Sequence, residues 1–137
     1  MGLIPVRADE VATVVTSLEM RTRPPLRPLP DAPLRLVPWP APDLAKYRAL
    51  FRRVGEPWLW FSRLVMDDNR LAAIVHDPGI SVYAAVDRQG IEVGMLELDH
   101  RRRGECELSY FALVPELVGH GLGRWLMAHA LALGWRK

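Results

Sequence analysis

Residues 114–135 read VPELVGHGLGRWLMAHALALGW, with three glycines in five positions at the start of a segment of helical periodicity. A glycine inside a helix costs roughly 1 kcal/mol relative to alanine. The sequence therefore predicts that Gly119, Gly121 and Gly123 serve a backbone conformation or a ligand. The helix is predicted to continue to Gly134. Its inward positions are Leu122, Trp125, Leu126, His129 and either Ala132 or Leu133.

A glycine turn that leads into a helix presents unpaired N–H groups and the positive end of the helix dipole. Such a turn binds phosphate well, since glycines let an anion approach the backbone closely. We therefore expect a pyrophosphate on the N–H groups of residues 119–124. A Walker A loop is excluded because Arg124 and Trp125 follow Gly123 where Lys and Ser/Thr are required. The glycine spacing also differs from that of a dinucleotide-binding fold.

Three strands precede the glycines. The stretches ISVYAAV (80–86), IEVGMLELDH (91–100) and ECELSYFALV (105–114) are separated by turn residues and predict an antiparallel meander. With Arg102 and Arg103 at the tip of the second hairpin, Glu107 would oppose Leu98. Glu97 would then oppose Leu108, and the two glutamates are predicted on opposite faces of the sheet.

The first half of the chain is rich in proline, with nine of the twelve prolines in residues 1–42. We expect an early strand over residues 11–19, an extended connector over 22–33 and a short strand over 34–37. Asp43 is expected to cap a helix that ends at Gly55. Its apolar stripe is Leu44, Tyr47, Leu50, Phe51 and Val54.

Two further helices are predicted, one beginning at Pro57 and a short one over residues 69–76. The first of these carries an aromatic cluster of Trp58, Trp60 and Phe61. Packing in the core is the favoured interpretation of this cluster, and a wall of a substrate cleft is the alternative.

The chain has 137 residues, enough for one domain with its own core, and its 18 basic and 16 acidic residues give a net charge of +2. This charge is too small to indicate a nucleic-acid partner, and no apolar run is long enough to predict a membrane span. A single cysteine, Cys106, excludes an internal disulfide and is typical of the cytoplasm. Cys106 and the four histidines lack the spacing of a metal site.

The segment VPELVGHGLGRWLM, following ELSYFAL, resembles motif A of the GCN5-related N-acetyltransferase (GNAT) superfamily, whose pattern is Gln/Arg-x-x-Gly-x-Gly/Ala. The pattern begins here at Val118, where the family has Gln or Arg. The resemblance spans residues 34–137 and implies an α/β (α+β) fold with a mostly antiparallel central sheet flanked by helices. Residues 1–33, the early strand and Pro-rich connector, are expected to lie outside this domain.

The resemblance implies an N-acetyltransferase that passes the acetyl group of acetyl-CoA directly to a primary amine of a small molecule or peptide, without a metal. The pyrophosphate would bind Val118, Gly119, His120, Gly121, Leu122, Gly123 and Arg124. The pantetheine arm would pair with Phe111, Ala112, Leu113 and Val114, and a backbone N–H near Leu113 would polarise the thioester carbonyl.

The general base that the resemblance implies is Glu107. In the histone-acetylating branch of the family, the general base is a glutamate eleven positions before the first residue of the motif, which corresponds here to Glu107. Glu97, Asp99 and His100 are kept as alternatives.

The family fold continues beyond the motif A helix with another strand, a helix and two further strands. We expect this chain to lack them and to form a partial domain with an open edge on the strand before the motif. The sequence would then be a fragment, a homodimer that covers this edge, or a protein that binds CoA weakly without turnover. The alternative function is accordingly a non-catalytic CoA-binding or structural remnant.

Overall fold

The computed structural model describes residues 3–25 and 27–136. Four antiparallel strands form one sheet in the order β1-β2-β3-β4. The strands are β1 (Arg35–Pro38), β2 (Ile80–Val86), β3 (Glu92–Asp99) and β4 (Glu107–Leu113). The helices are α1 (Leu44–Gly55), α2 (Asp68–Val75) and α3 (Leu122–Gly134), with 3-10 turns η1 (Glu56–Trp58) and η2 (Pro115–Leu117). The predicted α+β fold and three-stranded meander are confirmed.

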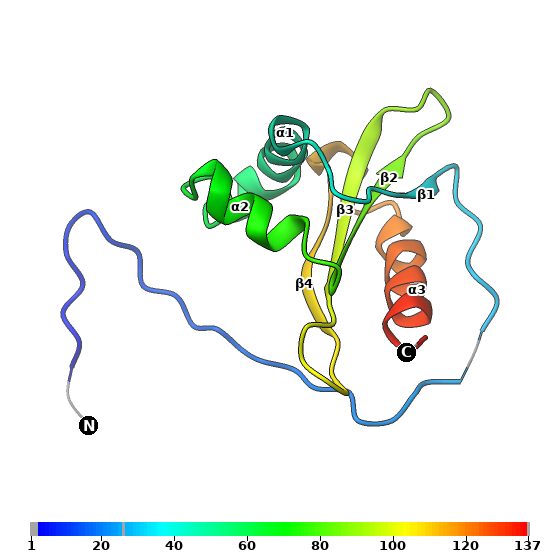
Figure 1. Cartoon of the computed structure of the whole chain (residues 1–137), viewed down its shortest axis with the longest axis horizontal. Coiled ribbons are helices and arrows are strands. Elements are labelled where there is room, and N and C mark those ends of the chain that lie inside the picture. Colours follow the sequence, from blue (N-terminus) through cyan, green and yellow to red (C-terminus); the bar gives the residue numbers. More distant parts are fainter. Residues whose placement is uncertain (1–2, 26, 137) are drawn as a thin grey trace.

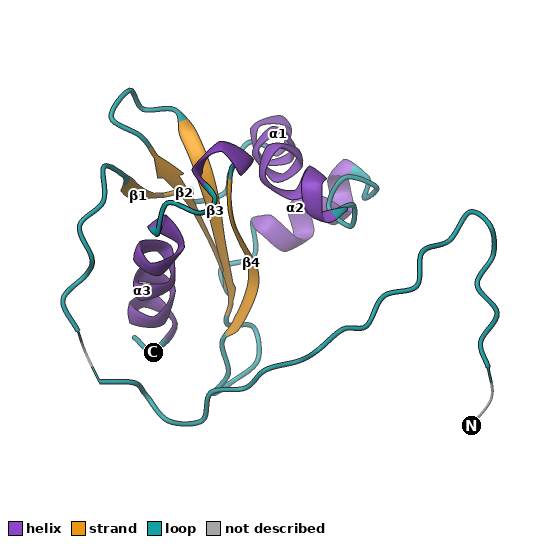
Figure 2. Ribbon diagram, turned by 180° about the vertical axis from the view of Figure 1, so that it is seen from behind, coloured by secondary structure: helices purple, strands orange, loops and turns teal. Residues whose placement is uncertain are grey.

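Helices lie on both faces of the sheet. Helices α1 and α2 cover one face and α3 covers the other (Figures 1 and 2). Helix α1 buries Tyr47, Leu50, Phe51 and Val54, four of the five residues of the predicted stripe. Helix α3 buries Trp125, Leu126 and Ala130. Complete burial of a large apolar side chain contributes about 1.5–3 kcal/mol, so both faces hold the fold together.

Aspartates begin α1 and α2. The Asp43 carboxylate accepts a hydrogen bond from the Lys46 N–H at 2.9 Å, and Asp67 accepts one from the Arg70 N–H at 2.8 Å. The predicted cap and the predicted end of α1 at Gly55 are confirmed. The predicted short helix is also present, as α2.

The prediction of a helix that begins at Pro57 is wrong. Only the 3-10 turn η1 forms there, because Leu59 takes a left-handed conformation with φ +56° that ends it. Residues 59–67 then form an irregular connection to α2. The turn η1 and this connection together, residues 56–67, are called the α1–α2 loop below.

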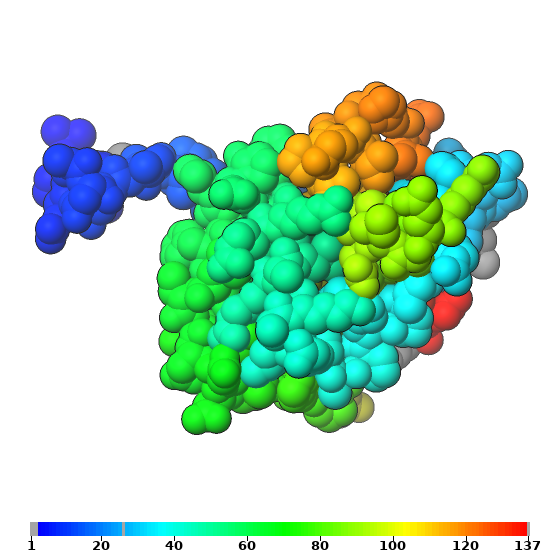
Figure 3. All heavy atoms as spheres, turned by 90° about the horizontal axis from the view of Figure 1, so that it is seen from above, coloured from blue at the N-terminus to red at the C-terminus, as the bar shows by residue number. Residues whose placement is uncertain are grey.

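The prediction of an early strand over residues 11–19 is also wrong. The side chains of Val11, Val14 and Val15 are 80%, 92% and 82% exposed, and the segment is in no strand. A strand requires a partner, and within the described residues β1 pairs only with β2. In the space-filling view the N-terminal segment projects from the rest of the molecule (Figure 3).

The predicted register of the second hairpin needs a correction. Glu107 lies opposite Asp99, Leu108 opposite Leu98, and Tyr110 opposite Glu97. The register shifts beside Glu97 because a β-bulge in β4 places two residues against one. Cross-strand partners share a face, so Glu107 lies on the same face as Asp99 and therefore as Glu97, two positions along β3. The prediction of opposite faces is wrong.

Candidate functional site

The glycines after β4 form an open loop. Gly119 has φ +87° and Gly121 has φ +76°, conformations that glycine adopts without strain. A Cβ added to Gly119, Gly121 or Gly123 would meet no atom within 4 Å. The fold therefore does not require these glycines for internal packing. Gly123 is helical, so backbone conformation does not explain it either.

The backbone N–H groups of this loop are unpaired. Within residues 3–25 and 27–136, no acceptor is found for the N–H groups of residues 119–123, and the Arg124 N–H is the next to bond, to the Gly121 carbonyl at 3.2 Å. No described side chain caps α3, and its first turn holds Arg124 and no acidic residue. A cation at a helix N-terminus opposes the dipole. The start of α3 is thus electropositive, with donors available to an anion.

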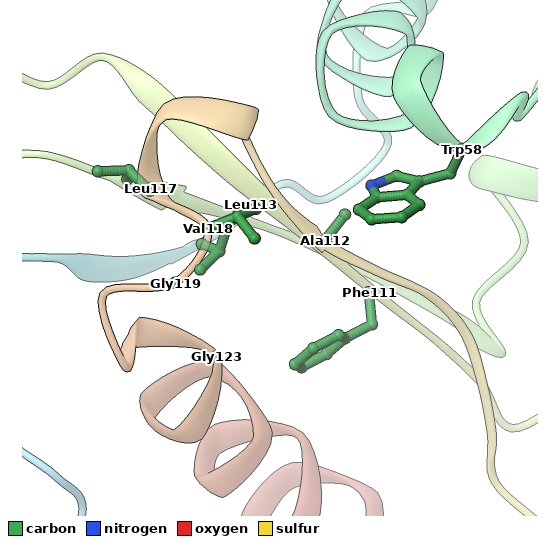
Figure 4. A pocket seen from close by; sticks show the side chains of 8 residues that line it. All are labelled: Trp58, Phe111, Ala112, Leu113, Leu117, Val118, Gly119 and Gly123. Atoms are coloured by element: carbon green, nitrogen blue, oxygen red, sulfur yellow. The ribbon is translucent and has the colours of Figure 1, made fainter.

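A cavity of about 240 Å³ lies between this loop, the end of β4 and the α1–α2 loop (Figure 4). It is lined by Trp58, Phe111, Ala112, Leu113, Leu117, Val118, Gly119 and Gly123. Six of these eight were predicted to bind the cofactor. The other predicted residues, Val114, His120, Gly121, Leu122 and Arg124, adjoin these six in the chain but do not line the cavity. Ligand cavities measure about 300–1,000 Å³, so this one has room for only part of a large cofactor.

The outer edge of β4 carries free backbone groups beside the cavity. The Val114 N–H donates to the Val93 carbonyl at 2.9 Å. Residues of an antiparallel strand point their backbone groups alternately toward and away from a neighbouring strand. The N–H and C=O groups of Phe111 and Leu113 therefore point away from β3. Among the described residues no strand pairs with β4 on that side.

Three polar side chains form a buried cluster on the opposite face of the sheet from α3. The Tyr47 hydroxyl donates to the Glu97 carboxylate at 2.6 Å, and the Arg63 guanidinium donates to the same carboxylate at 2.7 Å. Glu97 is fully buried and Arg63 is 9% exposed. The Arg63 Nε has no hydrogen-bond partner within the described part of the chain. This cluster was not foreseen, although an acid in the apolar run VGMLEL must be paired when buried.

Burial and the neighbouring charges shift the pKa values of two side chains of this cluster. Burial, followed by the negative charge of Glu97, raises the pKa of the Tyr47 hydroxyl. For Arg63, burial acts to lower the pKa, but the charge of Glu97 and the Tyr47 group outweigh it, so the pKa is raised. Tyr47 therefore stays protonated and Arg63 stays charged across the physiological range.

The α1–α2 loop is fastened to the sheet. The hydroxyls of Ser62 and Tyr110 are 2.6 Å apart, and Arg63 binds Glu97 of β3. The Trp60 ring packs against the rings of Phe51 and Tyr110, with centroids 5.5 Å and 5.1 Å away.

The expected core role of the aromatic cluster holds for Trp60 alone. Trp58 is 60% exposed and lines the cavity, and Phe61 is 67% exposed. The alternative, a cleft wall, describes Trp58.

The candidate general bases lie outside the cavity lining. Glu107 is exposed at the start of β4, six residues and about 20 Å along the strand from Leu113. Glu97 is held by Arg63 and Tyr47. Asp99 binds Arg101 at 2.6 Å, and this hydrogen bond lowers the pKa of its carboxyl group. The His100 ring is 3.5 Å from the Cys106 thiol.

Within the described ranges there is no group of three or more His, Cys, Asp or Glu side chains placed to hold a metal ion. Nor does any described helix have the length and apolar character needed to cross a bilayer.

Comparisons with known proteins agree on the fold. No protein-family model matches the chain, and no curated protein sequence does. An aminoglycoside acetyltransferase from an uncultured soil sample, solved with trehalose, has 16% identity and a TM-score of 0.58 over 74% of this chain and 69% of that chain. A mutant spermidine N-acetyltransferase from Vibrio cholerae has 22% identity and a TM-score of 0.55 over 77% and 64%.

A third structure, an IAA acetyltransferase from Bacillus cereus, has 20% identity and a TM-score of 0.52, over 74% of this chain and 57% of that one. The chain thus spans less than two thirds of this enzyme. At these identities the likeness establishes the fold, which is that of the GNAT acetyltransferases, and the predicted fold resemblance is confirmed.

Proposed function

We propose that this chain, which has the GNAT fold, binds acetyl-CoA and transfers its acetyl group to a primary amine. The observation that carries the proposal is the run of unpaired N–H groups over residues 119–123, placed directly beside the outer edge of β4. One end of this arrangement suits a diphosphate, and the other end suits an extended amide-containing arm.

The glycine loop would hold the phosphates. The donors at the start of α3 and the positive end of its dipole attract a diphosphate, and the open space around Gly119, Gly121 and Gly123 lets it approach. The exposed side chains of His120 and Arg124 flank this position. Val118, which replaces the family's Gln or Arg, contributes no side-chain hydrogen bond, so the backbone must supply the affinity.

The edge of β4 would hold the pantetheine arm and the thioester. The outward N–H and C=O groups of Phe111 and Leu113 can pair with the amides of the arm as a further strand would. Acetyl-CoA supplies an acetyl group activated as a thioester. The N–H of Leu113, or that of Phe111 on the same edge, would donate to the thioester carbonyl oxygen as negative charge develops there.

The amine must lose a proton when its nitrogen bonds to the acetyl carbon and the carbon–sulfur bond breaks. We propose that Glu107 receives this proton through water, because the strand distance from Phe111 is about 13 Å. The departing thiolate takes a proton from solvent. Glu107→Gln should lower kcat at least 10-fold at pH values below the pKa of the amine, with an unchanged affinity for acetyl-CoA. Glu105→Gln, in the adjacent hairpin, is the control, and an unaltered pH–rate profile would exclude Glu107.

Isothermal titration with acetyl-CoA tests the proposed function, followed by a free-thiol assay with a set of amines. Saturable binding with amine-dependent thiol release is the expected result. Saturable binding without release from any amine would support the second candidate, a CoA-binding remnant. If acetyl-CoA does not bind, the proposal is wrong and only the fold remains.

The outer edge of β4 can also pair with a second copy of the chain, since an unpaired strand edge is a template for another strand. We propose such a homodimer, in the cytoplasm, as the state without acetyl-CoA. Because the arm would occupy the same edge, acetyl-CoA should shift the dimer toward monomer in sedimentation experiments. A dimer that is insensitive to acetyl-CoA would place the interface elsewhere.

A further inference from the structure

The N-terminal segment carries an apolar pattern whose side chains all lie in solvent. Four residues follow the spacing i, i+3, i+4, i+7, which places them on one face of a helix: Val11, Val14, Val15 and Leu18. Val11 is the least exposed of the four, at 80%, and Leu18 is 93% exposed. A row of exposed apolar side chains on one helical face indicates a segment that packs against another surface.

The two ends of this pattern carry the signals of a helix. Asp9 suits the position before a helix, where its carboxylate accepts unpaired N–H groups, and Glu10 favours the positive end of the dipole. Arg21 lies at the opposite end, and Pro24 stops a helix shortly after it. Five of the six residues 11–16 are Val or Thr, which are poor helix formers. A short helix of this composition needs a packing surface in order to form, so the extended conformation is that of the undocked segment.

A matching apolar surface lies on the α1–α2 loop. A cavity of about 390 Å³, called the loop cavity below, is lined by Arg52, Glu56, Leu59, Trp60, Phe61 and Leu64. Leu59 and Phe61 are 72% and 67% exposed, and the nearby Val65 is 73% exposed. The loop cavity shares no lining residue with the cavity beside the glycine loop. It is therefore separate from the proposed cofactor site.

The charges of the segment and of this surface are complementary. Residues 8–20 contain three acidic residues and no basic one, whereas α1 contains four basic residues and no acidic one. Arg52 of α1 lines the loop cavity, and its side chain forms no ion pair with any residue that the structure describes. Glu10 and Glu19 each lie four positions from a valine of the pattern, so on a helix they border its apolar face. Either glutamate can pair with Arg52 while the valines enter the cavity.

The segment can reach the loop cavity of its own chain. It leaves the molecule on the side where α2 lies (Figures 1 and 3). Pro24 is half-buried between exposed neighbours, so the chain touches the folded part of the molecule there. The six residues between this contact and Leu18 span about 20 Å when extended. A helix over residues 10–20 would be about 16 Å long.

We infer that residues 9–20 dock as a helix into the loop cavity of the same chain, with the four apolar side chains of the pattern inward. The exposed apolar side chains of the segment and of the α1–α2 loop then cover each other, and a glutamate of the segment pairs with Arg52. Docking requires neither acetyl-CoA nor turnover, so it is tested apart from the proposed function.

Hydrogen exchange of the full chain tests the docking. The N–H groups of residues 13–20 should exchange roughly 10-fold or more slowly than in Val14→Asp, because a docked helix exchanges only when it opens. Thr13→Asp, on the opposite face of the helix, should retain this protection. Leu59→Asp should remove it, whereas Ile91→Asp, at an exposed apolar residue between β2 and β3, should not.

Disulfide formation shows which copy the segment occupies. In a Cys106→Ser background, Leu59→Cys is combined with a cysteine on the apolar face (Val11→Cys, Val15→Cys or Leu18→Cys) or, as the control, with Thr13→Cys. The fastest of the three apolar-face pairs should form an intramolecular disulfide roughly 10-fold or more faster than the control pair, since a disulfide requires close approach.

Three results would overturn the inference. Equal rates for the apolar-face and control pairs would mean that the segment meets Leu59 only by random collision. N–H groups that exchange as fast in the wild type as in Val14→Asp would mean that no helix is docked. A disulfide-linked dimer in place of the intramolecular bond would assign the segment to a second copy of the chain.

Discussion

The N-termini of the three helices differ in one respect. Those of α1 and α2 are capped by Asp43 and Asp67, whose carboxylates accept backbone N–H groups at 2.9 Å and 2.8 Å. The N-terminus of α3 begins at Gly121, has no side-chain cap and carries Arg124 in its first turn. All three helices need partners for the same unpaired donors. The chain provides internal partners in two cases and leaves the third set open.

The same contrast extends to the two faces of the sheet. On the α1 face, the buried carboxylate of Glu97 receives donors from both Tyr47 and Arg63. On the α3 side, the glycine loop and the outer edge of β4 present backbone donors that no described residue accepts. Polar groups that serve stability are paired within the fold, whereas those left unpaired beside a cavity are available for a ligand. The predictions below test this distinction.

The largest expected effect is on the α1 face. Glu97→Gln leaves the buried Arg63 charge without its counter-ion and should lower the free energy of unfolding by about 3–5 kcal/mol. Urea unfolding measures this change. Glu92→Gln is the matched control on the same strand, because the Glu92–Lys46 pair is accessible to solvent, with side chains 29% and 55% exposed, and surface pairs contribute at most about 1 kcal/mol. Equal effects in the two variants would show that the buried cluster is not structural.

The next effect concerns the α3 side. Gly121→Glu places a negative side chain where the phosphates are proposed to bind, and acetyl-CoA affinity should fall at least 100-fold, or about 2.7 kcal/mol. Gly90→Glu is the control for the backbone strain that any side chain at positive φ introduces. Gly90 has φ +82° and open space around it, as Gly121 does, but lies in the β2–β3 turn. If both variants lose affinity equally, strain rather than the lost phosphate site is the cause.

The third effect is a pH dependence. The pKa of Tyr47 is raised by burial and by Glu97, so the folded protein keeps the proton while the unfolded chain releases it above about pH 10. The contribution of the protonated Tyr47 hydroxyl to the free energy of unfolding is therefore fully present below pH 10. Above pH 10 the free energy of unfolding decreases by about 1.4 kcal/mol per pH unit. Tyr47→Phe should remove this part of the decrease between pH 10 and 11 in urea unfolding. An identical decrease in wild type and variant would contradict the assignment to Tyr47.

Local signals in the sequence were sufficient for much of the fold. The Asp43 cap, the periodicity of α1 and the three strands β2 to β4 depend on neighbouring residues, and they were predicted correctly. The errors arose where a distant contact decides the outcome. Residues 11–19 have strand-forming side chains, but no partner strand is present for them. The bulge beside Glu97 changes the register, and nothing in a count from the hairpin tip indicates it.

The site shows the same division. The glycine loop and the end of β4, which the sequence predicts to bind the cofactor, are contiguous in the chain, and the structure places residues of both around one cavity. Trp58 joins them from more than 50 positions away, through a loop held by Arg63 and Ser62, so the local aromatic cluster could suggest a cleft wall but not which residues lie opposite it. The pairing of Glu97 with Tyr47 is of the same kind, since the two partners are 50 positions apart in the chain.

The smallest expected effect completes the comparison of the helix N-termini. Asp43→Ala removes the cap of α1 and should reduce stability by about 1 kcal/mol, which lowers Tm by roughly 3–5 °C. Its acetyl-CoA affinity should remain that of the wild type, because among the described residues the Asp43 carboxylate bonds within its own helix turn. Asp43→Asn keeps an acceptor and should retain most of the stability. Gly121→Glu should show the converse, a loss of affinity larger than any loss of stability. A change in affinity with Asp43→Ala would mean that the capped and uncapped helix ends are coupled, and the division between structural and ligand-binding donors would fail.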